Sequence, residues 1–238
     1  MSSKNVGLFC SLFKGKDFIE GYLENILNQT YFKKTTFYIL DCDSPDNERD
    51  LILKYTSEYE NIKYKRLSKD PGLYAAWNLC IDWVDEPFIG NWNVDDRKTP
   101  WSTEVLMNPL LGDENLDLVY GKTLISNIAN ETWDKNSAKY IYPFLPHTFE
   151  NLLKNNSPHC MPIWRKDLHQ RFGYFNENYM TASDTDMWLR ACKGGANMKL
   201  VDSIVGLYYE NPKGRSTNPE TLKKMVEEVF AVRDLYRK

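Results

Sequence analysis

The chain has 238 residues, of which 42% are hydrophobic, so it is long enough and apolar enough to bury a core. The 30 Lys and Arg residues nearly balance the 33 Asp and Glu residues, which leaves a formal net charge of −3. No basic block appears in the sequence, and neutralising phosphates requires clustered cations. The composition therefore excludes a general nucleic-acid binder.

The first half of the chain alternates strand-like and helix-like segments. Apolar or alternating runs predict strands, and apolar residues at helical spacing predict helices between them. Asp17 and Glu20 have the spacing of a capping box at the start of the first helix. The strands are predicted at 6–13, 36–41, 61–67 and 87–92, and the helices at 17–27, 47–59 and 73–84. This alternation predicts right-handed crossovers and a Rossmann-like α/β fold with a mostly parallel sheet flanked by helices.

The second half of the chain is less regular, but it contains no repeat, low-complexity tract or linker. We therefore expect a single domain over residues 1–238. An amphipathic helix is predicted at the C-terminus, over residues 219–237, and its mixed charge favours packing on its own domain. The other predicted elements are a strand at 116–121, an extended segment at 157–164 leading into a short helix, a helix at 183–193, and one or two strands within 198–209.

The cysteine pattern bears on where the protein acts. The five cysteines are scattered and form no Cys-x-x-Cys pair, which argues against a zinc site or a disulfide framework. The N-terminus is too polar for a signal peptide, and no apolar run approaches the roughly 18 residues that span a bilayer. We expect a reduced, cytoplasmic protein without a transmembrane segment, associated at most peripherally with a membrane.

Polar residues lie at the carboxyl ends of three of the predicted strands: Ser11, residues 41–44 and residues 93–96. In parallel sheets, ligands bind beyond the carboxyl ends of the strands. Asp95 and Asp96 would suit a hard cation such as Mg²⁺ or Mn²⁺, whose remaining ligands are phosphate oxygens and water. Taken alone, residues 93–96 are also compatible with a capped strand end or turn, and residues 41–44 with an Asx-type turn, because Asp and Ser are common there.

Asp184 stands at the start of the helix predicted over 183–193. It is either a helix cap or a general base near an acceptor. Asp186 and Arg190 are four residues apart, which predicts a structural ion pair on one face of the helix.

Six segments, taken together and in this order, resemble family 2 glycosyltransferases, which have the nucleotide-diphospho-sugar transferase (GT-A) fold. The resemblance spans essentially the whole chain. Its first half contains a Gln-Thr-Tyr helix end, a strand ending in Asp, a Gly-Leu-Tyr helix and an Asp-rich metal strand. The six segments are FIEGYLENILNQTY, YILDCDSPDN, DPGLYAAWNLCI, FIGNWNVDD, RFGYFNENYMTASDTDMWLR and GLYYENPKGRSTN.

The resemblance implies roles for individual residues. Asp95 matches the direct metal ligand, with Asp96 beside it, and Asp184 matches the catalytic base of inverting members. Residues about 1–96 would form the nucleotide-binding half, and about 97–238 the acceptor-binding half with the C-terminal helix. The implied nucleotide-binding residues are Ser11, Asp41, Asp43, Asn78, Asn93 and Asp95.

Three further residues are weaker candidates for sugar or diphosphate contacts. Trp92 flanks the metal strand, and an indole ring suits a sugar face as well as a core. A polar loop is predicted over residues 211–219, and we call it the late loop. Arg215 and Ser216 lie in it, from where they would close over the diphosphate.

Two positions depart from the family pattern. Asn93 stands where the first Asp of the Asp-x-Asp motif is expected, and Ser183 replaces the Glu before the catalytic Asp. Asn93 can still bond a hydroxyl, so we expect altered rather than abolished nucleotide binding. Asp95 and Asp184, the minimal pair, are both present.

The resemblance thus implies a metal-dependent, inverting glycosyltransferase that uses Mn²⁺ or Mg²⁺. It would take a UDP-, GDP- or dTDP-linked sugar and a glycan or lipid-linked acceptor, in polysaccharide or glycoconjugate synthesis. Two alternatives remain open. A nucleotidyltransferase would need an early Gly-rich basic loop, to which residues 7–17 bear only a faint likeness. A non-catalytic nucleotide-sugar or glycan-binding module would explain the two departures.

Overall fold

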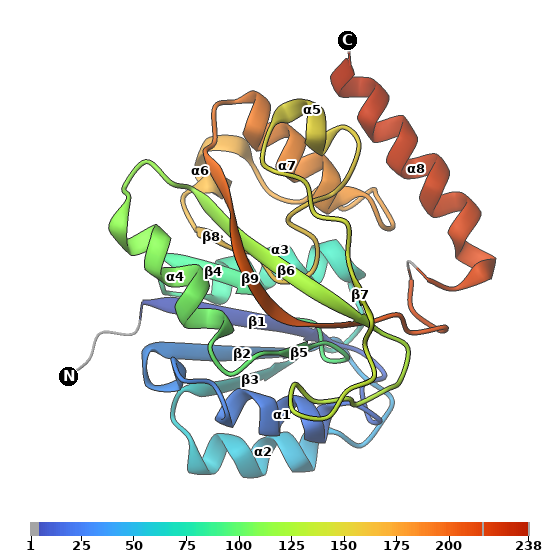
Figure 1. The fold of residues 1–238 in the computed structure, drawn as a ribbon. Helices are drawn as coiled ribbons and strands as arrows, with labels where there is room; N and C mark the ends of the chain where they lie inside the picture. The colour runs from blue at the N-terminus through green and yellow to red at the C-terminus, as the bar shows by residue number, and fades with distance from the viewer. Residues whose placement is uncertain (1–4, 216, 238) are drawn as a thin grey trace.

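The computed structural model describes residues 5–215 and 217–237. Strands and helices alternate through its first half, as predicted (Figure 1). These elements are β1 (Val6–Leu12), α1 (Ile19–Leu27), β2 (Thr35–Asp41), α2 (Arg49–Glu58), β3 (Ile62–Arg66), α3 (Leu73–Trp83) and β4 (Phe88–Asn91).

The second half adds short strands and further helices to the same sheet. Its elements are β5 (Arg97–Lys98), α4 (Ser102–Gly112), β6 (Leu118–Ser126), β7 (Tyr140–Ile141), α5 (Phe149–Leu152), β8 (Ile163–Arg165), α6 (Leu168–Phe172), α7 (Ser183–Lys193), β9 (Met198–Tyr209) and α8 (Pro219–Arg237). The region predicted as one or two strands, 198–209, is the single long strand β9.

One sheet runs through the molecule in the order β3-β2-β1-β4-β8-β6-β9-β5, with β7 paired to β6. The N-terminal strands β3, β2, β1 and β4 are all parallel, and β6 and β9 are parallel as well. Strand β8 joins these two groups through antiparallel pairs with β4 and β6. The predicted α/β fold with flanking helices is confirmed. Most of its parallel strand pairs lie in the first half of the chain, where the alternation of strands and helices predicted them.

Side-chain alternation along β1 and β2 explains why helices cover both faces. Leu8 and Ile39 point into a core shared with α1, α2 and α4, whereas their neighbours Phe9 and Leu40 point into a core shared with α3 and α7. Successive residues of a strand face opposite sides, so a strand that is apolar throughout requires cover on both. Figure 1 shows α1 and α2 beneath strands β1 to β3.

The predicted capping box is wrong. Helix α1 begins at Ile19, two residues after Asp17, and no side chain caps its N-terminus. Instead, the backbone N–H groups of Phe18 and Ile19 both donate to the carbonyl of Gly15. The turn that begins at Gly15 therefore accepts hydrogen bonds from backbone N–H groups at the N-terminus of the helix.

Gly206 lies where β9 is paired on both sides, and the backbone there is close. A Cβ atom at this position would stand 2.5 Å from the Arg97 carbonyl oxygen and 2.4 Å from Met161 Sδ. We expect Gly206→Ala to lower the free energy of unfolding by about 1–3 kcal/mol, which overpacking typically costs. Thermal unfolding tests this, with Gly112→Ala as the matched control because no atom lies within 4 Å of its added methyl. Equal melting temperatures for the two variants would contradict the expected close packing.

Candidate active site

The ends of three parallel strands bring the predicted nucleotide residues to one edge of the sheet. Leu12 of β1 is in register with Asp41 of β2, which is in register with Arg66 of β3. On the other side of β1, the Trp92 amide donates to the Phe9 carbonyl, so residues 93–96 emerge beside the end of β1. The predicted convergence of polar clusters is confirmed.

Asp41 is fully buried, and protein donors surround its carboxylate. Oδ2 accepts from the Tyr64 hydroxyl and from Arg66 Nη1, both at 2.6 Å, and Oδ1 accepts from the Ser44 amide at 2.8 Å. A nucleotide would have to displace one of these donors to bond Asp41. Arg66 Nη2 also pairs with Asp43 Oδ1 at 2.9 Å, and 45% of the Asp43 side chain is exposed. Asp43 is therefore the carboxylate that this cluster presents to a ligand.

Arg66 and Tyr64 were not among the predicted site residues. The signal that could have found them is their place at the end of the third parallel strand, directly beside Asp41.

A chain of contacts joins Ser11 to Asp184. Trp77 Nε1 donates to Ser11 Oγ at 3.2 Å, and the Trp77 ring packs edge-on against Tyr74 with centroids 5.4 Å apart. The Tyr74 hydroxyl in turn donates to Asp184 Oδ1 at 3.4 Å. The residue at the end of β1 and the predicted base at the start of α7 are therefore connected through two buried side chains of α3.

Asn78 lies one turn beyond Tyr74 on α3, but it faces the segment that leads into α7. Its Nδ2 donates to the Phe175 carbonyl and to Glu177 Oε1, each at 2.9 Å, and its Oδ1 accepts from the Phe175 amide at 3.1 Å. Both amide protons are occupied, so the predicted nucleotide contact is replaced by a structural role: Asn78 holds the segment before α7 against α3.

The acidic pair after β4 is divided between a buried and a more accessible carboxylate. Asp96 is 1% exposed; its Oδ1 accepts from the Tyr209 amide and its Oδ2 from Asn93 Nδ2, both at 3.1 Å. Asp95 is only partly buried and accepts one long bond, from Asn211 Nδ2 at 3.4 Å. Burial raises the pKa of Asp95, and burial together with the Asp95 charge raises the pKa of Asp96 well above its usual range.

The arrangement of Asp95 and Asp96 gives a physical reason for Asn, rather than Asp, at position 93. Its amide donates a hydrogen bond to Asp96, which an ionised Asp at position 93 cannot do. A third carboxylate there would add repulsion to a pair whose members already disfavour each other's charge.

The two carboxylates of the acidic pair are not equally placed to hold a metal. Asp95 is the more accessible and accepts one long bond, whereas both oxygens of the buried Asp96 accept bonds from the chain, so the predicted ligand role fits Asp95 better than Asp96. Within residues 5–215 and 217–237, no cluster of three or more His, Cys, Asp or Glu side chains could hold a metal by itself. A cation here would depend on phosphate oxygens and water for its other ligands, as Mg²⁺ and Mn²⁺ commonly do.

The predicted sugar contact of Trp92 is wrong for this structure. Its ring is fully buried and packs edge-on against Tyr22 and Phe37, with centroids 4.9 Å and 6.3 Å away. Its Nε1 donates to the Asp96 carbonyl at 3.3 Å. Trp92 thus supports the acidic pair from the core and has no surface for a sugar.

Asp184 is the residue best arranged for proton transfer. Its Oδ2 accepts from Asn156 Nδ2 at 2.7 Å, and its Oδ1 accepts from the Thr185 amide at 2.7 Å and from Tyr74. Burial raises the pKa of Asp184 to about 6, because desolvation outweighs these donated bonds. A carboxylate with such a pKa is ionised at neutral pH and is more basic than an exposed Asp.

The predicted ion pair within α7 is confirmed. Arg190 Nη2 lies 3.0 Å from Asp186 Oδ2, and the Tyr236 hydroxyl of α8 donates to Asp186 Oδ1 at 2.8 Å. Asp186 therefore has the structural role that its spacing predicted.

A small hollow of about 250 Å³ opens beside Tyr74. Its lining includes Gly72, Tyr179 and Arg215, so the late loop does reach this side of the site. Arg215 is exposed there and brings a positive charge, as a diphosphate contact requires. Ser216, its predicted companion, lies outside the described residues.

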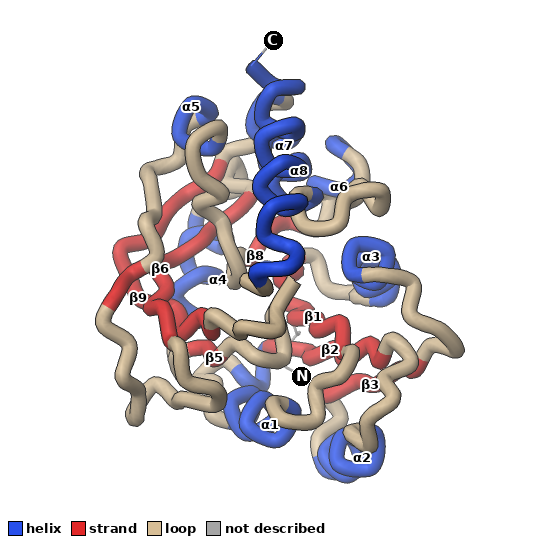
Figure 2. The backbone as a smooth tube through the Cα atoms, turned by 90° about the vertical axis from the view of Figure 1, so that its right-hand side faces the viewer, coloured by secondary structure: helices blue, strands red, loops and turns tan. Residues whose placement is uncertain are grey.

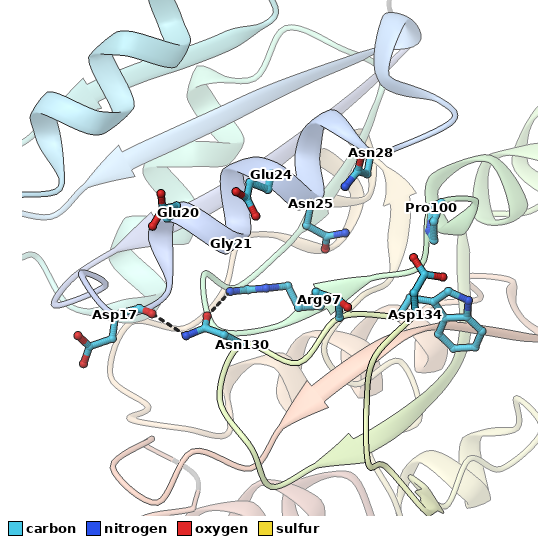
Figure 3. Close-up of a pocket in the computed structure, with 12 residues that line it drawn as sticks. Asp17, Glu20, Gly21, Glu24, Asn25, Asn28, Arg97, Pro100, Asn130 and Asp134 are labelled. Atoms are coloured by element: carbon cyan, nitrogen blue, oxygen red, sulfur yellow. Dashed lines mark hydrogen bonds between the residues drawn. The ribbon is translucent and has the colours of Figure 1, made fainter.

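A larger cavity of about 540 Å³ lies between α1 and the loop after β6 (Figure 3). Arg97 Nη2 donates to Asn130 Oδ1 at 2.6 Å, and Asn130 Nδ2 donates to the Asp17 carbonyl at 2.8 Å, which ties the two walls together. The side chains of Asp17, Glu20, Glu24 and Asp134 make the lining acidic. None of the predicted nucleotide-binding residues lines this cavity, so it lies apart from the candidate donor site.

Residues 11–172 match the family model described as "Glycosyl transferase family 2". The match covers more than half of the chain; it includes Ser11, Asp41 and Asp95 and ends before Asp184. The chain belongs to the family 2 glycosyltransferases. No curated protein matches its sequence.

Solved structures of glycosyltransferases share the fold of this family 2 member. The complex of Staphylococcus aureus TarS 1–349 with UDP superposes with a TM-score of 0.73 at 16% identity, covering 97% of this chain and 65% of that one. The complex of the same protein with UDP-GlcNAc gives 0.74 at 15% identity, covering 98% and 70%. Mannosyltransferase PcManGT from Pyrobaculum calidifontis, with GDP-Man and Mn²⁺, gives 0.72 at 15% identity, covering 99% and 65%.

These likenesses show that the chain has the GT-A fold. The chain spans about 65% of the length of the TarS fragment and of the mannosyltransferase. Within the described residues, no helix is both long and apolar enough to cross a membrane.

Proposed function

We propose that this family 2 glycosyltransferase moves a sugar from a nucleoside-diphosphate donor to an acceptor hydroxyl, with inversion at the anomeric carbon. The observation that carries the proposal is the connected path from Ser11 through Trp77 and Tyr74 to Asp184. It joins a strand-end nucleotide position to a carboxylate with the environment of a general base.

In the proposed reaction, Asp184 accepts the proton of the acceptor hydroxyl as its oxygen bonds to the anomeric carbon. The bond from that carbon to the diphosphate breaks, and the nucleoside diphosphate leaves with the electron pair. Attack from the face opposite the leaving group inverts the centre. Asn156 and Tyr74 orient the Asp184 carboxylate, and its elevated pKa favours accepting the proton at neutral pH.

A divalent cation, Mn²⁺ or Mg²⁺, would neutralise the charge that develops on the departing diphosphate. Asp95 is the residue that would hold it, and Arg215 would add a second positive charge from the late loop. The Mn²⁺ in the mannosyltransferase complex supports this part of the proposal.

For the donor we propose a UDP-, GDP- or dTDP-linked sugar, because the structural neighbours were crystallised with UDP, UDP-GlcNAc and GDP-Man. Residues about 1–96 would bind its nucleotide, and about 97–238 the glycan or lipid-linked acceptor, in polysaccharide or glycoconjugate synthesis. The described cysteines are all free thiols, in keeping with the proposed cytoplasmic setting at or away from a membrane surface.

A thermal-shift screen of UDP, GDP, dTDP and CMP, each with and without Mn²⁺, tests the proposal. A ligand at 100 times its Kd adds about 2.7 kcal/mol to the stability, which raises the melting temperature by several degrees. We expect one nucleoside diphosphate to give a shift that grows with Mn²⁺. No shift with any of these nucleotides would contradict the proposal and favour a non-catalytic module.

A further inference from the structure

The segment from the end of β9 to the end of α8 contacts both acidic parts of the site. The Tyr209 amide donates to Asp96, and Asn211 Nδ2 donates to Asp95. After the late loop, the chain continues as α8, which packs along α7, the helix that carries Asp184 (Figures 1 and 2). One continuous stretch of chain thus links the predicted metal ligand to the predicted base.

Glu228 of α8 accepts hydrogen bonds from the segment that leads into α7. Its Oε1 accepts from the Met180 amide at 2.7 Å. Its Oε2 accepts from the Thr181 amide at 2.7 Å, the Ala182 amide at 2.9 Å and the Thr181 hydroxyl at 3.0 Å. Every donor in this set lies in the three residues before Ser183, where α7 begins.

The N-terminus of helix α7 has no side-chain cap. Ala182 occupies the cap position and has no side chain that can accept a bond from the first turn. Glu228 therefore satisfies backbone donors of the α7 entry from a distant part of the chain, and its negative charge lies at the favourable end of the helix dipole. The two residues after Ala182 are Ser183 and Asp184.

Two further contacts fix the orientation of α8. Val232 is fully buried in the core that contains Met187 and Trp188 of α7, and Tyr236 bonds Asp186. Glu228, Val232 and Tyr236 are spaced four residues apart, so they form one stripe along α8 facing α7. Helix α8 is thus held against α7 and its entry from Glu228 to Tyr236, and of these three contacts Glu228 reaches the residues that directly precede Ser183 and Asp184.

We propose that Glu228 is a positioning residue for Asp184: by fixing the backbone of residues 180–182, it sets where the Asp184 carboxylate meets the acceptor. The proposal rests on the proposed function, in which Asp184 is the base. It gives the C-terminal helix a role in the chemistry as well as in packing.

The test compares Glu228→Ala with Glu227→Ala. Glu227 is the neighbouring carboxylate on α8. Its side chain is 64% exposed, and its ion pair with the exposed Lys223 is long, with Nζ and Oε1 3.9 Å apart. Hydrogen exchange followed by mass spectrometry measures the amides of residues 180–182, and release of UDP or GDP from UDP-GlcNAc or GDP-mannose measures turnover. Circular dichroism and binding of the nucleoside diphosphate confirm that each variant is folded.

In Glu228→Ala we expect the amides of residues 180–182 to exchange at least about 10-fold faster. We expect kcat to fall by about 10- to 100-fold, because small displacements of a reacting group have effects of that size, with nucleotide binding unchanged. Glu228→Gln keeps one carbonyl oxygen and should be intermediate. Glu227→Ala should match the wild type.

Unchanged exchange at residues 180–182 in Glu228→Ala would overturn the proposal. So would an equal loss of turnover in Glu227→Ala, or a loss of nucleotide binding that parallels the loss of kcat. If the wild type releases no nucleotide from any sugar donor, it is the proposed function that fails. The exchange experiment still decides in that case whether Glu228 holds the entry of α7.

Discussion

Asp184→Asn is expected to bind nucleoside diphosphate as the wild type does and to lose about 100- to 10,000-fold in turnover, the usual contribution of a positioned acid or base. The amide cannot accept the acceptor proton at neutral pH, while its shape matches that of the carboxylate. Binding survives because the donor-side residues Ser11, Asp43 and Asp95 are not altered.

The same substitution should stabilise the protein at high pH. The pKa of Asp184 is about 6 in the folded state, above the ordinary value of 3.8, so the folded protein binds this proton more tightly than the unfolded chain does. The ionised carboxylate therefore costs stability above pH 6, and the cost disappears as the pH falls below the unfolded value. At pH 8 the penalty is at most about 3 kcal/mol.

Asn at position 184 avoids this penalty and finds a new partner. The Oδ1 atom of Asn156 is buried and has no hydrogen-bond partner, so a turned Asn156 amide can accept from the new side chain. We expect Asp184→Asn to melt at a higher temperature than the wild type at pH 8 and at an equal temperature near pH 4.

Nucleotide release between pH 5 and 9 and melting curves between pH 4 and 9 check both parts. In the wild type, kcat should rise with pH through about 6 as Asp184 loses its proton. Asp202→Asn is the matched control, because that side chain is 90% exposed and its ion pair with Lys122 contributes little to stability. Full turnover in Asp184→Asn would remove Asp184 as the base.

The sequence predicted well those parts of the fold that local patterns determine. The helices at 183–193 and 219–237 have the predicted ends, because their apolar spacing and flanking Gly and Pro residues are local signals. Helix α4, at Ser102–Gly112, was not predicted. Its sequence contains Pro109, and its apolar residues contact the sheet through tertiary packing rather than a clear helical stripe.

The candidate site also has features that the sequence predicts and features that it does not. Strand-end positions such as Asp41 and Asp95 follow from topology, because parallel strands deliver their ends to one edge. What the side chains of the site bond depends largely on residues far away in the chain: Arg66 for Asp41, Tyr209 for Asp96, and Glu228 for the entry of α7. No spacing in the sequence encodes these partners.

Trp92 shows why a residue next to a predicted site can still be core. It directly follows β4, and its neighbour along the chain is Asn93 at the site edge. The indole packs into the core against Tyr22 and Phe37, whereas Asn93 is only partly buried and bonds Asp96. Burial, rather than proximity in the sequence, decides which aromatic ring is available to a sugar.

Asp95→Ala is expected to abolish the Mn²⁺-dependent part of nucleotide binding. Asp95 is the more accessible carboxylate of the acidic pair and accepts one long bond of 3.4 Å, so its removal takes away the direct ligand proposed at this strand end. Changes to residues behind a metal ligand typically cost 10- to 100-fold in affinity, and loss of the ligand itself should exceed about 100-fold. Binding measured without Mn²⁺ should change far less.

Asp96→Asn provides the contrast, because the structure gives Asp96 an internal role. Its oxygens bond Tyr209 and Asn93, and it lies beneath Asp95 with 1% of its surface exposed. We expect Asp96→Asn to keep the response to Mn²⁺ and to change mainly the melting temperature. Titrating nucleoside diphosphate calorimetrically at fixed Mn²⁺ separates the two variants. If Asp96→Asn lost the Mn²⁺ response while Asp95→Ala kept it, the ligand would be Asp96, and the buried arrangement seen here would have to open when the donor binds.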